Sequence, residues 1–315
     1  MAAAVAAAVA AATLAAGCGG GSGDAGELRL GYLANITNAA ALVGKDRGIF
    51  ARDLRGTVVT TTKFTTGTEA TAALLSGSLD ASYLGMGPVI TAQSRAPGQL
   101  TVIAGAGEAG AVLVVRRGSG IRTLADLRGR RVGFPGYGNT QDLSLQWELG
   151  RIGLTAGRGQ DVHTVRVANA DLRTAFERGA LDAALCPEPW GSALVDRGLA
   201  TVLMPADRIM GDGHYPTTVL VVRTAYARAH PGVVARLREA NARAVAASRD
   251  PRAVATAFLA AAKSKVPEDV LLRGIASNVP TTAINPVGTR RLIDAARDAG
   301  YLREPVTVAQ VTPAR

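Results

Sequence analysis

The chain has 315 residues, 48% of them apolar, and a formal net charge of +10. This length and apolar fraction suffice for one large or two smaller domains, and they exclude a globally disordered chain. The basic residues are mostly scattered arginines, with no basic tract interleaved with aromatic side chains and no zinc-ligand or helix-turn-helix spacing. We therefore expect an arginine-rich solvated surface and no nucleic-acid partner.

The N-terminal segment has the pattern of a lipoprotein leader. Residues 1–16 are uncharged and small or apolar, which is typical of a secretory signal but short for a membrane span of about 20 residues. "LAAGC", ending at Cys18, resembles the bacterial lipobox, in which the cysteine becomes the lipidated N-terminus. We expect a lipoprotein signal peptide over residues 1–17, an acylated Cys18 and a flexible tether over residues 18–27.

Other interpretations of the two cysteines stay open. The Lys or Arg usual near the start of a signal peptide is absent, which is compatible with a true start upstream of Met1 or with an Ala-rich tail and a chance cysteine. If Cys18 is acylated, Cys186 has no disulfide partner. We expect Cys186 to be a small apolar residue at the end of a strand, because no flanking sequence would activate its thiol.

Strand-like and helix-like segments alternate along most of the chain. Alternating or β-branched patterns predict strands over residues 27–33, 57–64, 79–85, 99–107, 111–120, 130–136, 162–168, 181–186, 201–206 and 219–223. Capped amphipathic patterns predict helices over residues 37–48, 65–77, 123–129, 138–154, 169–179 and 191–198. This order predicts parallel βαβ units, hence an α/β fold. After residue 223 the pattern is helical, and residues 303–315 read as a tail or an edge segment.

Two phrases recur at consistent places. "Gly-x-Leu-Asp-Ala" contains Asp80 and again Asp182, 102 residues later, and "VLVVR" occurs at Val112–Arg116 and Val219–Arg223. Either repeat alone is explained by coincidence in an Ala-rich chain, but both together favour two similar lobes joined by two crossing strands. Such lobes can hinge, and a ligand is expected in the crevice between them, outside the carboxyl ends of the strands.

The repeats also suggest where the lobes begin and end. We expect lobe 1 to comprise residues 28–112 and 222–315, and lobe 2 to comprise residues 113–221. The bend after each Leu-Asp-Ala strand, "GMGP" or "PEPW", is expected to form one wall of the crevice.

Three helix starts are expected to face the crevice. Residues 35–38, 65–69 and 138–142 are rich in hydroxyl groups, amides and glycine. The free N–H groups and the positive dipole end of a helix start can bind a small anion without an arginine clamp. Each segment alone reads as an ordinary helix cap, so the prediction depends on their number and on their common location.

The stretch "CPEPW" is the most distinctive part of the predicted second lobe. Glu188 is assigned either to a ligand's ammonium or hydroxyl group or to solvent, and the sequence does not decide between them. Trp190 offers a flat apolar wall to a ligand, with packing inside the lobe as the alternative. His214, just before the second crossing strand, is expected to border the cleft. The sequence has no catalytic triad, metal-ligand spacing, dinucleotide motif or phosphate loop, so no enzyme and no cofactor are expected.

Five stretches of the chain resemble the substrate-binding proteins of ABC importers for nitrate, taurine and aliphatic sulfonates. They are "GYLANITNAAALVGKDRGIF", "ALLSGSLDASYLGMGPVITA", "TLADLRGRRVGFPGYGNTQDLSLQWEL", "AFERGALDAALCPEPWGSALVD" and "TTVLVVRTAYARAHP". The resemblance implies a periplasmic-binding-protein fold of type II that closes on one solute. By motif, it implies ligand contacts at Asn35, Thr37, Asn38, Thr66, Gly67, Gly87, Asn139, Thr140, Gln141, Glu188 and Trp190.

The resemblance also implies partners and a location. It predicts a monomeric receptor, anchored outside the cytoplasm by its acyl chains, that delivers a small organic anion such as a sulfonate or taurine to an ABC permease with its ATPase. Nitrate, bicarbonate and a pyrimidine vitamin precursor are alternative solutes. Many relatives have His at the position of Asn38 and "GPNP" in place of "GMGP", so the solute can differ from the usual one.

Two other functional classes compete with this interpretation. Some small-metabolite enzymes use the same two-lobed scaffold, but they are cytoplasmic and would not need a lipobox or a Gly/Ser tether. A sensory domain is a third possibility, but we expect no second module or membrane-spanning helix that would carry a signal.

Overall fold

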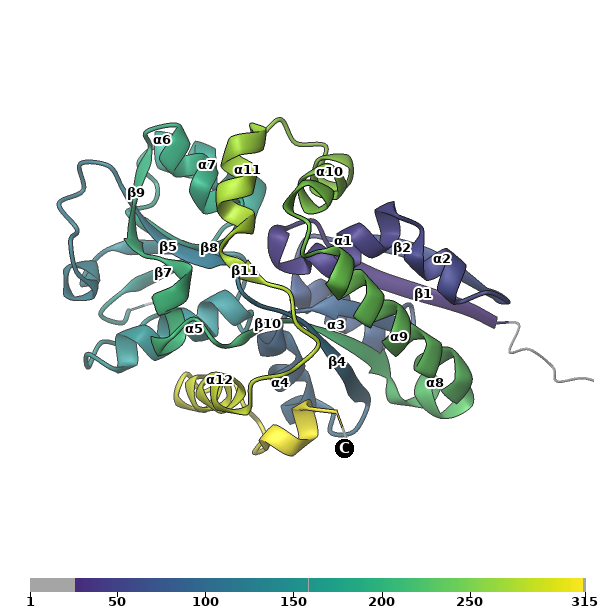
Figure 1. The fold of residues 1–315 in the computed structure, drawn as a ribbon. Coiled ribbons are helices and arrows are strands. Elements are labelled where there is room, and N and C mark those ends of the chain that lie inside the picture. The colour runs from purple at the N-terminus through teal and green to yellow at the C-terminus, as the bar shows by residue number, and fades with distance from the viewer. Residues whose placement is uncertain (1–25, 158, 314–315) are drawn as a thin grey trace, which may run out of the picture.

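The computed structural model describes residues 26–157 and 159–313, which fold around two β-sheets flanked by helices (Figure 1). The predicted signal peptide, the lipidation site Cys18 and residues 18–25 of the predicted tether lie outside the described residues. We call the part built on the six-stranded sheet lobe 1 and the part built on the five-stranded sheet lobe 2. The predicted two-lobed α/β fold is confirmed.

The sheet of lobe 1 combines parallel and antiparallel strands in the order β11-β4-β10-β3-β1-β2. Its strands are β1 (Gly26–Leu33), β2 (Thr57–Phe64), β3 (Ala81–Leu84), β4 (Leu100–Ala109), β10 (Pro216–Arg223) and β11 (Asn278–Val279). β1 is parallel to β2 and β3, whereas β10 is antiparallel to β3 and β4. Leu28 and Leu30 are fully buried on the same face of β1, as their period of two requires.

The sheet of lobe 2 repeats this arrangement in the order β7-β6-β8-β5-β9. Its strands are β5 (Ala111–Arg116), β6 (Arg131–Phe134), β7 (His163–Arg166), β8 (Ala183–Pro187) and β9 (Ala200–Met204). β6 is parallel to β7 and β8, and β5 is antiparallel to β8 and β9. Cys186 is fully buried in β8, as predicted, and burial raises the pKa of its thiol well above the ordinary value.

The two "VLVVR" runs are the equivalent antiparallel strands of the two sheets. The first belongs to β5 of lobe 2 and the second to β10 of lobe 1. The chain therefore crosses between the sheets beside these strands, at Gly110 and over residues 205–215. Gly110 has φ +78°, and a Cβ there would lie 3.1 Å from both Asn278 Oδ1 and Thr37 Cγ2, so glycine suits this crossing.

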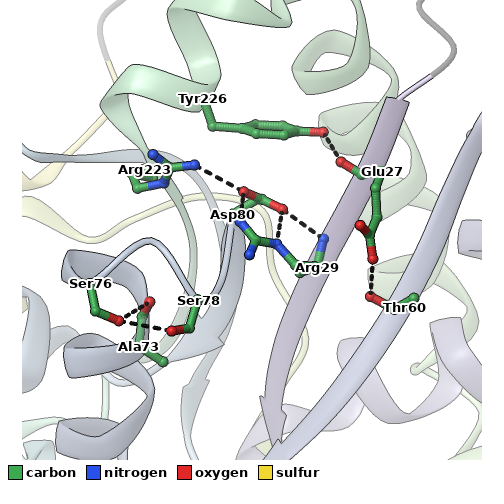
Figure 2. A network of polar contacts seen from close by, with 9 residues as sticks. All are labelled: Glu27, Arg29, Thr60, Ala73, Ser76, Ser78, Asp80, Arg223 and Tyr226. Carbon is green, nitrogen blue, oxygen red and sulfur yellow. Dashed lines mark hydrogen bonds and ion pairs between the residues drawn. The ribbon is translucent and has the colours of Figure 1, made fainter.

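The repeated aspartate of lobe 1 lies in a polar network at the start of β3 (Figure 2). The Asp80 carboxylate accepts hydrogen bonds from Arg29 Nη2 at 2.7 Å, from Arg29 Nε at 2.8 Å and from Arg223 Nη2 at 3.1 Å. It also accepts from the main-chain N–H of Arg29 at 3.0 Å. The two Arg side chains come from β1 and β10, so the network ties together three adjacent strands of this sheet, β10, β3 and β1.

Lobe 2 contains the same network around the second aspartate. The Asp182 carboxylate accepts from Arg116 Nη2 and from Arg131 Nε, each at 3.3 Å, and from the main-chain N–H of Arg131 at 2.9 Å. Arg116 ends β5 and Arg131 begins β6, the counterparts of β10 and β1. Both repeated phrases therefore meet in one structural unit that occurs once in each lobe.

Helices cover the sheets and also connect the lobes. They are α1 (Ala39–Asp46), α2 (Ile49–Asp53), α3 (Gly67–Leu75), α4 (Met86–Arg95), α5 (Thr140–Gly150), α6 (Leu172–Glu177), α7 (Trp190–Asp196), α8 (Thr224–Ala229), α9 (Pro231–Ala247), α10 (Pro251–Ala262), α11 (Glu268–Ile275) and α12 (Pro286–Asp298). α9 and α10 pack on α1, whereas α11 contacts α7, and α12 contacts both α4 and α5. The C-terminal segment therefore touches both lobes. No helix among the described residues combines the length and apolarity needed to cross a bilayer.

Helix α4 was not predicted as a helix. The expected bend "GMGP" is in fact its start: Gly85 is the N-cap, and Pro88 lies in the first turn. Proline is compatible with a first turn because the N–H groups there have no partner within the helix. The last segment is also more ordered than a tail, since residues Val308–Val311 form a 3₁₀ turn whose Val311 is fully buried.

Candidate ligand-binding site

A cavity lies between the two lobes, where strands end and helices begin. The part of it that the centre of a water-sized group can reach is about 30 Å³. The lining residues from lobe 1 are Leu33, Asn35, Thr37, Asn38, Thr65, Thr66, Gly67, Gly85, Pro88 and Thr217. Those from lobe 2 are Pro135, Asn139, Thr140, Gln141, Asn169 and Pro187. The lining includes every ligand contact that the resemblance implies at the three predicted helix starts: Asn35, Thr37, Asn38, Thr66, Gly67, Asn139, Thr140 and Gln141.

The cavity wall is polar but uncharged. None of its described lining residues has an ionisable side chain. The helices α3, α4 and α5 begin at Gly67, Met86 and Thr140, at the edge of the cavity. First-turn N–H groups have no partner within their helix, and the dipole places about half a positive charge there. The arrangement therefore suits a small anion or a neutral polar molecule and disfavours a cation.

The turn over residues 35–38 is held by its own side chains. The Asn35 amide oxygen accepts from the Thr37 hydroxyl at 2.8 Å, from the Asn38 N–H at 3.2 Å and from Asn38 Nδ2 at 3.1 Å. Asn38 Nδ2 also lies 3.4 Å from Thr218 Oγ1, and its Oδ1 accepts from the Leu33 N–H at 3.3 Å. Asn38 therefore orders the turn, and the Asn35 Nδ2 group is the side-chain donor left for a solute.

The first turns of α4 and α5 touch across the lobe boundary. The Gly87 N–H donates to Thr140 Oγ1 at 3.1 Å. A Cβ at Gly87 would lie 2.7 Å from the Thr140 nitrogen, and one at Gly85 would overlap Thr140 Oγ1. Glycine at both positions thus permits an approach that any side chain would prevent.

Asn139 makes a second contact between the lobes. Its Oδ1 accepts from the Thr68 hydroxyl of lobe 1 at 3.4 Å. A Cβ at Gly67 would lie 3.2 Å from the same oxygen, and one at Gly136 would lie 2.8 Å from Asn139 Nδ2. Because the Thr68–Asn139 and Gly87–Thr140 contacts join the two lobes, they exist only when the lobes are close, and the structure represents a closed arrangement.

Glu188 faces neither the cavity nor solvent. Its side chain is buried, and its carboxylate accepts from the Ser192 N–H and hydroxyl, both at 3.0 Å. Its main-chain carbonyl accepts from the Ile36 N–H of lobe 1 at 2.9 Å. Burial raises the pKa of the Glu188 carboxyl, and the hydrogen bonds from Ser192 oppose that shift. Glu188 therefore caps α7 and supports the lobe contact through its backbone.

Three further predicted residues lie off the cavity wall. Trp190 is the first residue of α7, and its ring packs edge-on against Phe258 at a centroid distance of 6.4 Å. His214 is 62% exposed, with Nδ1 3.6 Å from Glu108 Oε2. Gly87 lies behind the wall, where it contacts Thr140. The sequence predicted that these residues lie in segments next to the cleft. It did not predict which way they face, because that depends on packing against segments distant in the chain.

Several lining residues were missed by sequence reasoning, among them Asn169 and Thr217. Asn169 begins the predicted helix over residues 169–179, and it follows β7 as Thr65 follows β2, the counterpart strand of lobe 1, so this parallel could have revealed it. Its Oδ1 is buried and has no hydrogen-bond partner among the described residues. Thr217 lies near the start of β10, where no local pattern distinguishes a cavity residue.

Comparison with known proteins decides the family. A model of the NMT1-like family matches residues 22–262, a range that contains every lining residue of the cavity. The chain belongs to the NMT1-like family. This NMT1-like protein is 26% identical, over 261 residues, to the putative aliphatic sulfonates-binding protein of Escherichia coli (strain K12), covering 82% of this chain and 78% of that one.

Two other curated relatives match over shorter stretches. The taurine-binding periplasmic protein of Escherichia coli (strain K12) is 29% identical over 195 residues, which cover 62% of this NMT1-like protein and 58% of the relative. A putative binding protein of Brucella abortus (strain 2308) is 28% identical over 159 residues, which cover 50% of this chain. The chain spans about half the length, 46%, of that relative.

Solved structures share the fold of this NMT1-like protein. The alkanesulfonate-binding protein SsuA from Xanthomonas axonopodis pv. citri, bound to MOPS, superposes with a TM-score of 0.76 at 24% identity, covering 91% of this chain and 97% of that one. The periplasmic nitrate-binding protein NrtA from Synechocystis PCC 6803 has a TM-score of 0.74 at 16% identity, covering 91% and 84%. These proteins are binding proteins rather than enzymes, and the resemblance predicted from the sequence is confirmed.

Proposed function

We propose that this NMT1-like protein is an extracytoplasmic receptor that binds a small organic anion between its lobes. The observation that carries the proposal is the uncharged cavity between the lobes, onto which helix starts from both lobes converge. A solute held there contacts both lobes only when they are close, so its binding energy favours the closed state. The Gly87–Thr140 and Thr68–Asn139 contacts would add to closure.

The solute class that we propose is a sulfonate or a taurine-like molecule. A sulfonate is fully ionised and offers three acceptor oxygens, which matches a wall of neutral donors such as Asn35 Nδ2 and helix N–H groups. Relatives named for binding aliphatic sulfonates and taurine support this class. Nitrate, bicarbonate and a pyrimidine vitamin precursor remain the rival solutes, with "GMGP" and Asn38 as the sequence features that could alter selectivity.

The remaining parts of the proposal concern partners and location. The receptor would work as a monomer and deliver its solute to an ABC permease driven by an ATPase. An acyl chain on Cys18 would hold it at the outer surface of the cell membrane, with the Gly/Ser segment as a tether.

A thermal-unfolding screen tests the solute class. The purified protein is heated with methanesulfonate, taurine, nitrate, bicarbonate or a pyrimidine, with choline as a cationic control. A bound solute at about 100 times its dissociation constant stabilises the folded state by about 2.7 kcal/mol, so we expect the melting temperature to rise by about 5 °C with a sulfonate. If no anion raised it, or if choline raised it equally, the proposed function would be rejected.

A further inference from the structure

A second pocket lies beside the cleft cavity and has a different chemistry. Helices α6 and α7 of lobe 2 form one wall, and the connection between α10 and α11, residues 263–267, contributes to the other. The part of it that the centre of a water-sized group can reach is about 180 Å³, compared with about 30 Å³ in the cleft cavity. Asn169 borders both this pocket and the cleft cavity.

The floor of this pocket is apolar. Leu172 and Leu194 are buried, and the half-buried ring of Trp190 completes the surface. Removing an apolar body of this size from water is favourable by about 25 cal/mol per Å² of buried area. The pocket therefore favours an alkyl or aromatic group over a fully polar ligand.

The rim of the same pocket is cationic. Arg173, Arg197 and Lys265 line it, and no Asp or Glu is among its described lining residues. Arg173 pairs with Glu177 at 3.0 Å, but neither Arg197 nor Lys265 forms an ion pair with any residue that the structure describes. Asp196, which adjoins Arg197 in sequence, is paired elsewhere, with Arg273. Two unneutralised cations next to an apolar floor complement an anion with an apolar body.

An unsatisfied donor supports the same conclusion. Trp190 Nε1 is buried and has no hydrogen-bond partner among residues 26–157 and 159–313. A buried donor without a partner costs about 1–3 kcal/mol, and an acceptor on a bound molecule would remove that cost once the ring turned to bring the N–H to the pocket surface. The unpartnered Asn169 Oδ1 could accept from a hydroxyl or N–H group of the same molecule.

We propose that this pocket, the Trp190 pocket, binds an organic anion with an apolar body, such as an alkyl sulfonate or carboxylate of about six carbons. Such a molecule would contact lobe 2 through α6 and α7 and the C-terminal helices through residues 263–267, so it would favour the closed arrangement. The anion is either the distal part of a solute whose head lies in the cleft or a separate molecule. In both cases the bound group is a negative charge on an apolar body. The proposal for the Trp190 pocket does not depend on the solute class proposed for the cleft cavity.

The fluorescence of Trp190 provides a direct test. The chain has two tryptophans, so Trp147→Phe leaves Trp190 as the single reporter. Hexane-1-sulfonate should change its emission saturably, and hexylammonium should not. If Trp147→Phe folds poorly, isothermal titration of the unsubstituted protein with hexane-1-sulfonate measures the binding, and the rim variants described next assign it to the pocket. Absence of saturable binding in both experiments would overturn the proposal.

A charge-matched pair of variants tests the cationic rim. Arg197→Gln with Lys265→Gln should weaken hexane-1-sulfonate binding about tenfold. Arg55→Gln with Arg122→Gln removes the same charge from exposed side chains elsewhere and should leave the affinity unchanged. An equal loss in both pairs would mean that net charge, and not this pocket, attracts the anion, which would refute the site.

A competition experiment then distinguishes the tail of a solute bound in the cleft from a separate anion. If saturating methanesulfonate blocks hexane-1-sulfonate, and Asn139→Ala weakens both, the pocket holds the tail of one cleft solute. If hexane-1-sulfonate binds beside methanesulfonate and ignores Asn139→Ala, the pocket holds a separate anion. Either outcome supports the site, provided that the rim variants weaken hexane-1-sulfonate. A hexane-1-sulfonate affinity equal to that of methanesulfonate and insensitive to the rim variants would contradict it.

Discussion

Arg223, the last residue of β10, donates a hydrogen bond to Asp80 at the start of β3, at 3.1 Å. Arg116 makes the equivalent contact with Asp182 in the other lobe. The aspartate of each Leu-Asp-Ala phrase thus pairs with the arginine that ends a "VLVVR" phrase in the same sheet. The two sequence repeats therefore supply the two partners of one ion pair, which in each sheet connects the antiparallel strand, β10 or β5, to the adjacent strand, β3 or β8.

Removing either aspartate should destabilise its own lobe. In Asp80→Asn the charged hydrogen bonds from Arg29 and Arg223 are lost, and we expect the free energy of unfolding to fall by about 2 kcal/mol, measured by urea denaturation. Asp182→Asn should have a similar effect. Asp298→Asn, which alters an exposed ion pair, is the control and should change little. Equal stability of Asp80→Asn and the parent would contradict the role assigned to the network.

The same carboxylates should make stability depend on acid. Burial alone would raise the pKa of Asp80 and of Asp182, but the hydrogen bonds from the arginines hold each pKa below its ordinary value. Each group therefore binds its proton more weakly in the folded state, and its stabilisation is present at neutral pH and lost as the pH falls through the folded pKa. Below about pH 4, the urea midpoint of unfolding should fall more steeply with decreasing pH in the parent than in Asp80→Asn. Parallel pH profiles would refute this.

The glycines at the lobe contact should control closure. Gly87→Ala would force a Cβ to within 2.7 Å of the Thr140 backbone, so we expect the lobes to stay apart and the solute affinity to fall at least tenfold. Small-angle X-ray scattering with saturating solute should show a larger radius of gyration than the parent. Gly150→Ala is the matched control, because a Cβ there meets nothing within 4 Å. Normal compaction of Gly87→Ala would disprove the importance of this contact.

One negative charge added to the cleft cavity should weaken anion binding without changing the stability of the fold. Asn35→Asp keeps the oxygen that accepts from Thr37 and Asn38 but replaces Nδ2 with an oxygen and places a negative charge in an uncharged cavity. We expect sulfonate binding to weaken by more than tenfold in calorimetric titrations, with little change in the unfolding midpoint. Asn285→Asp makes the same chemical change at the exposed cap of α12 and should bind normally. Full affinity in Asn35→Asp would remove the cleft cavity as the anion site.

Glu188→Gln should leave solute binding intact, because the Glu188 carboxylate caps α7 and does not line the cavity. Burial raises the pKa of this carboxyl in the folded state, so folding becomes less favourable as the pH rises from its unfolded value to its folded value. The variant should therefore gain stability relative to the parent at neutral pH and lose this advantage near pH 4. A large loss of sulfonate affinity would instead support the ligand contact that the sequence suggested.

The sequence predicted the arrangement of strands and helices better than the direction of individual side chains. Alternating strands, capped helices and the two repeats were enough to infer two similar lobes and three helix starts at one cleft. Helix α4 was missed because Gly87 and Pro88 read as a turn, although proline is harmless in a first turn. The direction of Trp190 depends on Phe258 of α10, 68 positions further along the chain, and no local pattern encodes such a contact.

The placement of β10 affects the order in which the molecule can be assembled during synthesis. All strands of the lobe 2 sheet come from one continuous stretch, from Ala111 to Met204. The sheet of lobe 1 needs β10 between β3 and β4, so its N-terminal strands must wait until residue 223 has emerged, from the ribosome or, in the proposed export, from the membrane. The lobe that begins second is therefore the first that can be completed, and the nascent lobe 1 is the part exposed to chaperones and proteases in the meantime.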